Sequence, residues 1–254
     1  EWYRYNRARY YRTAVRRSVA TARHVIADSQ ATADDLRRYL RVADERITVA
    51  PLGVEERLRP ADEEAVAAAR ARYGLPERFI LYVGTLEPRK NLVRLVEAYG
   101  RVADRCGCDL VLAGREGWKT GPIHGAIQAN PAAGRIHLPG FIEQEHLAAV
   151  LTAAHAFAWP SLYEGFGLPP LEAMACGTPV LTSDVSSLPE VVGDAALLAN
   201  PYDVEAIAHG LETIATDGAV RAGLKARGHI QAQRFSWRRT AEIVAGVYRQ
   251  VLER

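Results

Sequence analysis

Two glutamates stand eight positions apart in a stretch rich in glycine and proline. The stretch from Glu164 to Glu172 reads Glu-Gly-Phe-Gly-Leu-Pro-Pro-Leu-Glu, and it follows a short apolar run that ends at Trp159. The apolar run predicts a buried strand, and the glycines predict a loop. A helix is predicted from Leu168 to Ala175, because proline is tolerated in a first helical turn and Gly177 can end the helix. The first glutamate is therefore expected in a loop and the second on a helix.

This stretch offers groups that can bind an anion joined to a polyol. Gly165 and Gly167 let the backbone approach a ligand without a Cβ in the way. The N–H groups of Gly167 and Leu168 lie at a predicted helix N-terminus, which attracts anions. The carboxylates of Glu164 and Glu172 can accept hydrogen bonds from sugar hydroxyls. An anion joined to polyols indicates a nucleotide sugar, but an ordinary strand-loop-helix unit with one exposed and one capping glutamate has the same residues.

Two adjacent cations, Arg89 and Lys90, stand in a loop that follows a predicted strand and Gly84. Together they can neutralise a diphosphate leaving group as its charge develops. A solvated basic turn is the alternative. The two glutamates would also fit a two-carboxylate hydrolase, but a hydrolase does not need the glycine-rich anion site that lies between them.

A regular alternation of strands and helices begins at about Val54. It predicts an α/β fold, a Rossmann-like parallel sheet with helices on both faces. Right-handed crossovers place the carboxyl end of every strand on one edge, where ligands bind. Gly84, Gly140 and Glu164 all follow strands at this edge, so we expect one pocket. Strands are predicted at 79–83, 109–113, 136–138, 156–159, 179–182 and 196–198, and helices at 62–73, 92–105, 123–130, 143–153, 168–175, 188–192, 203–215, 219–233 and 236–252.

Two long motifs resemble those of a known enzyme family. Residues 164–180 resemble the E-x7-E signature of retaining glycosyltransferases of family 4, which have the two-domain GT-B fold. Residues 82–92, Tyr-Val-Gly-Thr-Leu-Glu-Pro-Arg-Lys-Asn-Leu, are similar to the phosphate-contacting loop of that family. The resemblance extends from about Val25 to the C-terminus. It implies transfer of a hexose, with mannose as the expected sugar, from a nucleotide diphosphate sugar to a glycan or lipid-linked acceptor in polysaccharide biosynthesis.

The resemblance also implies roles for single residues. Glu172 matches the glutamate that binds the ribose hydroxyls, and Glu164 matches the one that contacts the donor sugar near the reacting carbon. Thr85 stands where the family often has an arginine, so Arg89 is expected to supply the missing charge beside Lys90. No metal or other cofactor is expected, and GDP-mannose is the donor we favour over UDP-sugars. The expected catalytic residues are Glu164, Lys90 and Arg89, and the expected donor-binding residues are Gly84, Thr85, Phe141, Ile142, Gly165, Phe166, Gly167, Leu168 and Glu172.

The same comparison predicts the domain organisation. Residues 1–53 resemble the end of the family's N-terminal domain and its linker, residues 54–235 the nucleotide-sugar-binding domain, and residues 236–254 a C-terminal crossover helix. The bulk of the N-terminal domain, which holds the acceptor site, has no counterpart in this sequence. An isolated nucleotide-sugar-binding module, inactive alone or completed by another polypeptide, is therefore the second functional hypothesis.

Composition narrows the classes of partner. Residues 1–24 contain seven arginines, one acidic residue and five aromatic residues. This pattern fits a helix on an anionic membrane surface, or a helix packed on a part of the protein outside this sequence. A third hypothesis is an interaction protein that works through this segment. The net charge of +2 argues against nucleic acid as a partner. Three cysteines in no metal-binding pattern and no apolar run of about 18 residues indicate the cytoplasm, with peripheral contact at the inner membrane face as an option.

Overall fold

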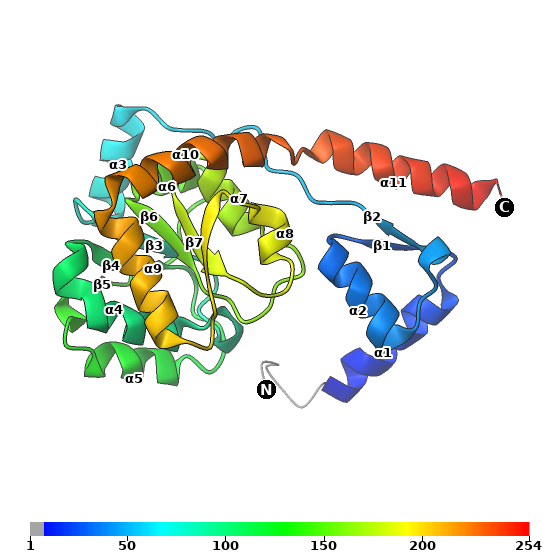
Figure 1. Ribbon diagram of the computed structural model, residues 1–254, viewed down its shortest axis with the longest axis horizontal. Coiled ribbons are helices and arrows are strands. Elements are labelled where there is room, and N and C mark those ends of the chain that lie inside the picture. The colour runs from blue at the N-terminus through cyan, green and yellow to red at the C-terminus, as the bar shows by residue number, and fades with distance from the viewer. Residues whose placement is uncertain (1–7, 254) are drawn as a thin grey trace.

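The computed structural model describes residues 8–253, with side chains from Tyr10 onward. Residues 1–7 of the basic aromatic segment therefore lie outside the described part of the chain. The chain forms a small unit near its N-terminus and a larger unit (Figure 1). The small unit contains two parallel strands and the larger unit a six-stranded sheet. The small unit consists of α1 (Ala8–Thr21), β1 (Val25–Ala27), α2 (Gln30–Leu40), a 3-10 turn (Asp44–Arg46) and β2 (Ile47–Val49).

The larger sheet is parallel throughout, with the strand order β5-β4-β3-β6-β7-β8. The chain builds outward from β3 in one direction and from β6 in the other, so the sheet has its switch point between these two strands. The strands are β3 (Phe79–Val83), β4 (Asp109–Ala113), β5 (Ile136–His137), β6 (Ala156–Trp159), β7 (Val180–Ser183) and β8 (Ala196–Ala199).

Helices cover both faces of this sheet (Figure 1). α4 (Leu92–Cys106) packs on α5 (Gly121–Ala129) and α9 (Val204–Thr216) on one face. On the other face, α6 packs on α3 and α10 packs on α7. These helices and the remaining two are α3 (Glu63–Tyr73), α6 (Leu147–Ala153), α7 (Leu168–Ala175), α8 (Leu188–Val192), α10 (Gly218–Gln233) and α11 (Trp237–Leu252), and two 3-10 turns lie at Pro88–Lys90 and Ala133–Arg135. The predicted fold class is confirmed.

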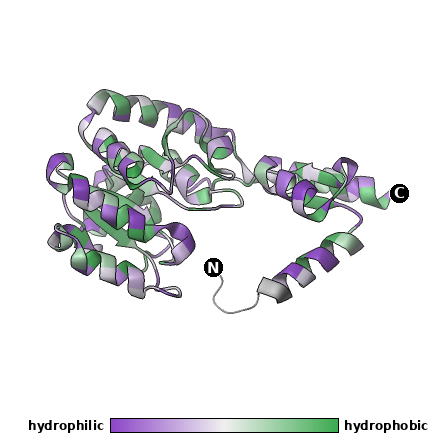
Figure 2. Cartoon of the chain, turned by 60° about the horizontal axis from the view of Figure 1, so that its bottom comes forward, coloured by the Kyte–Doolittle hydropathy of each residue, from purple (hydrophilic) through white to green (hydrophobic). Residues whose placement is uncertain are grey.

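The core lies where the sequence is apolar in continuous runs. All residues of β6 and four of the five residues of β3 are buried, as expected for strands covered on both faces. Figure 2 shows the hydrophobic strands between helices whose surfaces are mixed in hydropathy. Among the described residues, no helix combines the length and the apolar character needed to cross a membrane.

Local signals at helix ends are mostly confirmed, but α5 begins at Gly121 rather than at the predicted 123, and α6 begins later than predicted. Ser29 caps α2, because its side chain accepts a hydrogen bond from the Thr32 amide. The helix predicted from residue 143 is wrong at its start, since α6 begins at Leu147. The Glu143 amide donates instead to the hydroxyl of Tyr73 at the end of α3 (3.2 Å). A tertiary contact therefore holds this polar stretch in a turn.

The linker after β2 and the last helix meet at one point. The Thr240 hydroxyl of α11 donates to the Pro51 carbonyl oxygen (2.6 Å). A Cβ on Gly53 would lie 2.0 Å from the Trp237 amide nitrogen, so only glycine allows this approach. From here α11 runs out beside the small unit (Figure 1). The division of the chain at residues 53 and 235 stays a prediction.

Candidate functional site

The candidate site forms where two loops leave neighbouring strands at the centre of the sheet. β3 and β6 are hydrogen-bonded neighbours at the switch point. Their carboxyl ends therefore lie side by side, and the loops that follow them lead to α4 and α7 on opposite faces of the sheet. The β3–α4 loop (residues 84–91) carries Arg89 and Lys90, and the β6–α7 loop (residues 160–167) carries Glu164. Folding thus brings together groups that lie 74 positions apart in the chain.

The three predicted catalytic residues form one ion-pair network. Lys90 Nζ lies 2.6 Å from Glu164 Oε1, and Arg89 Nη1 lies 2.8 Å from Glu164 Oε2. Arg89 also contacts Glu87 at 2.8 Å. Lys90 and Glu164 are each only 9% exposed, so water screens this pair weakly. The cations expected for a diphosphate are therefore engaged with the chain's own carboxylates.

The environment acts on both members of the buried pair. Burial works to raise the pKa of Glu164, but Lys90 and Arg89 outweigh it, and the net pKa lies below its usual value. Burial lowers the pKa of Lys90, and its attraction to Glu164 opposes this only in part. Lys90 Nζ also lies 4.3 Å from the ring centroid of Trp159, which provides a cation–π contact.

The start of α7 presents backbone amides without partners. Within residues 8–253, the N–H groups of Gly165, Phe166, Gly167 and Leu168 donate no hydrogen bond. Gly167 has a φ of 112°, which favours glycine at this turn. Unpaired donors at a helix N-terminus can bind an anion, and these four lie directly after Glu164 in the chain.

Two serines after β7 hold the β6–α7 loop in place. The Glu164 amide donates to Ser186 Oγ at 3.0 Å. Ser187, which is fully buried, donates to the carbonyl oxygens of Glu164 (3.0 Å) and Phe166 (2.6 Å). The Phe166 side chain packs edge-on against Phe235. The segment after β7 thus fixes the loop, and the unpaired amides of the loop lie at the carboxyl edge of the sheet.

Glu172 lies outside the ion-pair network. It is partly buried on α7, and its carboxyl group has no hydrogen-bond partner among the described residues. Burial raises its pKa to about 7, with a further contribution from Glu55, while Arg57 acts in the opposite direction. The two glutamates of the motif therefore occupy different electrostatic environments.

The remaining predicted residues line the same edge of the sheet. The Gly114 amide donates to the Gly140 carbonyl oxygen (2.7 Å), and a Cβ on Gly114 would lie 1.9 Å from the Gly84 carbonyl oxygen. The loops after β3, β4 and β5 are therefore in direct contact. Thr85 is exposed, and its carbonyl oxygen accepts from the Tyr82 hydroxyl.

Next to these loops lies the segment predicted to contact a base. The ring of Phe141 is half-exposed, and the guanidinium of Arg115 lies 4.2 Å from its centroid. Ile142 is buried in the core, so only its backbone is placed to meet a ligand. Arg115 therefore covers the one exposed aromatic ring of this segment.

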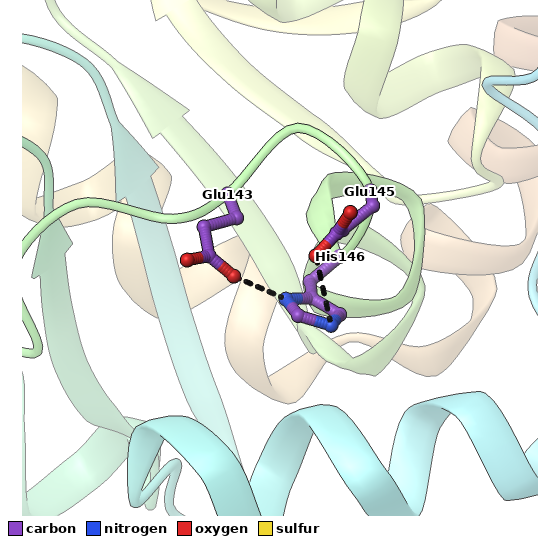
Figure 3. A group of neighbouring side chains, drawn as sticks. All are labelled: Glu143, Glu145 and His146. Atoms are coloured by element: carbon purple, nitrogen blue, oxygen red, sulfur yellow. Dashed lines mark ion pairs between the residues drawn. The ribbon is translucent and has the colours of Figure 1, made fainter.

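A second cluster of potential ligands lies away from this edge. Ligand atoms of Glu143, Glu145 and His146 lie within 4.8 Å of one another (Figure 3). Glu143 approaches Nδ1 of His146 (3.4 Å) and Glu145 approaches Nε2 (3.9 Å). One metal ion binds a single ring nitrogen, and Glu143 is also paired with Arg72 at 2.7 Å. We interpret this cluster as a set of surface ion pairs.

The sequence analysis missed several residues that shape the site. Trp159 beneath Lys90, the two serines after β7, and Tyr163, whose hydroxyl donates to Asp35 Oδ2 at 2.6 Å, were not singled out. The serine pair carried a usable signal, because Ser186 and Ser187 follow a predicted strand at the ligand-binding edge. Nothing in the sequence indicated the contact between Tyr163 and the small unit.

Family models and curated relatives match most of this chain. The family model described as Glycosyl transferases group 1 matches residues 67–231, and that described as Glycosyltransferase Family 4 matches residues 1–58. An O-antigen chain mannosyltransferase B from Escherichia coli is 36% identical over 241 residues, which cover 93% of this chain and 63% of the relative. A serotype-specific mannosyltransferase WbdA from Escherichia coli is 33% identical over 239 residues, 90% of this chain and 29% of the relative. The chain thus spans less than two thirds of both.

Solved structures share the fold. Sucrose-phosphate synthase from Thermosynechococcus elongatus matches with a TM-score of 0.84 at 30% identity, over 98% of this chain and 63% of that one. HepE from Anabaena, in complex with UDP-glucose, matches with a TM-score of 0.83 at 22% identity, over 93% and 66% of the two chains. A family model that covers more than half of the sequence and this shared GT-B architecture lead to one conclusion: the chain belongs to the group 1 family of glycosyl transferases.

Proposed function

We propose that this chain is the donor-binding half of a retaining, metal-independent glycosyltransferase that takes a hexose from a nucleoside diphosphate sugar. The observation that carries the proposal is the Lys90–Glu164–Arg89 network beside the free amides at the start of α7. Two cations and a helix N-terminus at a sheet switch point fit a diphosphate. The matched Escherichia coli mannosyltransferases support mannose as the sugar, and the UDP-glucose bound by HepE supports a nucleotide sugar as the ligand class.

Each group has a distinct role in the bound state. The diphosphate lies between Lys90, Arg89 and the amides of Gly167 and Leu168. Glu172 receives the ribose hydroxyls, and the segment that contains Phe141 and Ile142 meets the base. We favour GDP-mannose as the donor. Because both cations are already paired with Glu164, donor binding exchanges one anionic partner for another and frees the Glu164 carboxylate for the sugar.

The chemistry follows from where charge develops. The bond between the anomeric carbon and the diphosphate oxygen breaks, and its electron pair stays on that oxygen. Lys90, Arg89 and the α7 amides stabilise this charge, which is the task that a divalent metal would otherwise perform. The acceptor hydroxyl oxygen forms the new bond to the anomeric carbon, and its proton passes to the departing diphosphate. The product keeps the anomeric configuration of the donor.

The second part of the proposal concerns the acceptor and the membrane. We propose a glycan or lipid-linked acceptor in polysaccharide biosynthesis. Arg12 and Arg16, one turn apart on an exposed face of α1, can rest on an anionic membrane at the cytoplasmic side. The alternative is a binding module that holds the nucleotide sugar without transferring it. It is favoured by the small unit, which has only two strands in its described part.

The proposal is tested first by binding. Thermal melting with GDP, UDP and ADP, and with a sugar conjugate of each, should single out one base by a clear upward shift. Transfer to a mannose-containing acceptor, unchanged by EDTA and with the anomeric configuration read by NMR, tests the mechanism. Binding without transfer favours the module. An absence of any nucleotide effect contradicts the donor site.

A further inference from the structure

Asp28 is one of the residues of the small unit that lie against the β6–α7 loop. It follows β1 at the carboxyl edge of the two-stranded sheet, the edge at which parallel sheets hold ligands. A Cβ on Gly165 would lie 3.0 Å from Asp28 Oδ2. The carboxylate therefore stands against the backbone next to Glu164.

Hydrogen bonds from the residues that follow Asp28 fix this position. Ser29, fully buried, donates to the Gly165 carbonyl oxygen at 2.6 Å, and Thr32 donates to the same oxygen at 3.1 Å. Glu190 of α8 accepts from the Gln30 amide at 2.8 and 2.9 Å. Its carboxylate is thus the anion at the α2 N-terminus. The backbone next to Asp28 is therefore held against the β6–α7 loop.

One oxygen of this carboxylate lacks a partner. Among the described residues, the buried side-chain atoms without a hydrogen bond are Asp28 Oδ1 and Trp159 Nε1. Asp28 lies against Gly165, and the Trp159 ring contacts Lys90, so both residues border the candidate site. Buried polar atoms are nearly always paired, and an exception requires an explanation such as a ligand. An unpaired buried acceptor costs about 1–3 kcal/mol, which a hydroxyl donor from a ligand would offset.

We propose that Asp28 is a saccharide-binding residue, whose carboxylate accepts a hydrogen bond from a sugar hydroxyl at the reaction centre. This inference rests on the proposed function. A phosphate is excluded as the partner of Asp28, because both groups are anionic. The cations Lys90 and Arg89 are excluded because they are already paired with Glu164. A neutral hydroxyl donor matches a carboxylate oxygen. The donor sugar and the acceptor sugar both carry such hydroxyls, and a small opening of the contact between Asp28 and Gly165 admits either.

The test compares three probes by calorimetric titration. The first is the nucleoside diphosphate, among GDP, UDP and ADP, that binds the wild-type chain most tightly. The second is its hexose conjugate, and the third is methyl α-mannoside added with the diphosphate at saturation. In Asp28→Asn and Asp28→Ala we expect the Kd of the diphosphate to change less than twofold. We expect the Kd of one saccharide probe to rise about tenfold or more, as for a hydrogen bond to a charged group.

The identity of the affected probe assigns the source of the hydroxyl. Weaker binding of the hexose conjugate assigns Asp28 to the donor sugar, and weaker binding of the mannoside assigns it to the acceptor. The matched control is Asp34→Asn on α2, whose exposed carboxylate pairs with Arg37, and no probe should respond to it.

Equal changes in all probes, or unchanged binding of the hexose conjugate with no loss for the mannoside, overturn the inference. If Asp28→Ala does not fold, the near-isosteric Asp28→Asn decides alone. A wild-type chain that binds no diphosphate instead refutes the proposed function, and this inference falls with it.

Discussion

Glu164 and Glu172 are the same residue type at the two ends of one motif, and the fold places them in opposite electrostatic environments. Glu164 is buried between Lys90 and Arg89, and its pKa lies below the usual value despite burial. Glu172 is partly buried, without a cation in contact, and its pKa is raised to about 7. Burial acts in the same direction on both carboxyls, so the partners decide the outcome.

The difference assigns the two carboxyls to different work. Glu164 is ionised and already bonded, so it acts through the cations that it holds. Glu172 is close to half-protonated at neutral pH and unpaired, so it can both accept from and donate to ribose hydroxyls. Four predictions test this contrast.

The largest effect is expected for Glu164→Gln. The substitution leaves Lys90 buried without its partner, and loss of one member of a buried pair costs about 3 kcal/mol of the free energy of unfolding. Urea denaturation at pH 7 measures it. Glu242→Gln, in an exposed pair with Arg238, is the control and should change stability by less than about 0.5 kcal/mol. A Glu164→Gln variant as stable as wild type would remove the first half of the contrast.

Glu172→Gln should raise the free energy of unfolding at alkaline pH, which is the opposite of the effect expected for Glu164→Gln. A folded pKa raised from 4.5 to about 7 contributes stability that is present below pH 4.5 and is lost as pH rises through 7. The variant should therefore gain on wild type by less than about 0.5 kcal/mol at pH 4.5 and by up to about 3 kcal/mol at pH 8. Urea denaturation at several pH values checks the trend. A difference independent of pH would show that Glu172 has an ordinary pKa.

Ligand binding should separate the two sides of the motif. Lys90→Ala should weaken a nucleoside diphosphate by about 30-fold and leave the nucleoside unaffected, because the lost contact is charge-assisted and phosphate-specific. Glu172→Gln should weaken nucleoside and diphosphate by the same factor, about tenfold. Titration calorimetry with both ligands measures this. If Lys90→Ala weakened both ligands equally, Lys90 would be a structural residue.

The smallest effect concerns the support of the β6–α7 loop. Ser187→Ala removes the donor to the Glu164 and Phe166 carbonyl oxygens, and we expect a loss of about 1 kcal/mol in the free energy of unfolding. Thermal or urea unfolding measures it against Ser18→Ala on the exposed surface of α1. A loss no larger than that of the control would mean that other contacts hold the loop.

Much of the fold was predictable because its signals are local. The strands at 79–83, 109–113 and 156–159 and the helix at 168–175 are confirmed residue for residue. These segments are continuous apolar runs or have proline and glycine at their ends. The start of α6 was not predictable, since the Glu143 amide donates to the Tyr73 hydroxyl, 70 positions away in the chain, and this tertiary contact fixes the backbone before the helix.

The site was predictable in its members but not in its connections. The two motifs contain Arg89, Lys90 and Glu164. Parallel-sheet topology implied that the loops of these residues meet at one edge of the sheet. That Glu164 would pair with both cations, and that Trp159 would contact Lys90, depends on side-chain directions that spacing does not encode. The contact between Asp28 and Gly165 depends on how the small unit packs against the larger one.

By itself, the sequence determined the element order, the parallel sheet, the family and the residues at the ligand-binding edge, since each follows from periodicity, boundary residues or a contiguous motif. The tertiary structure alone decided which charges pair, which of the two glutamates has its pKa raised to about 7, and which residue of the small unit lies against Gly165. The physical reason is that electrostatic and desolvation energies depend on distances between atoms remote in the chain, and these distances exist only once the sheet and the two units are assembled.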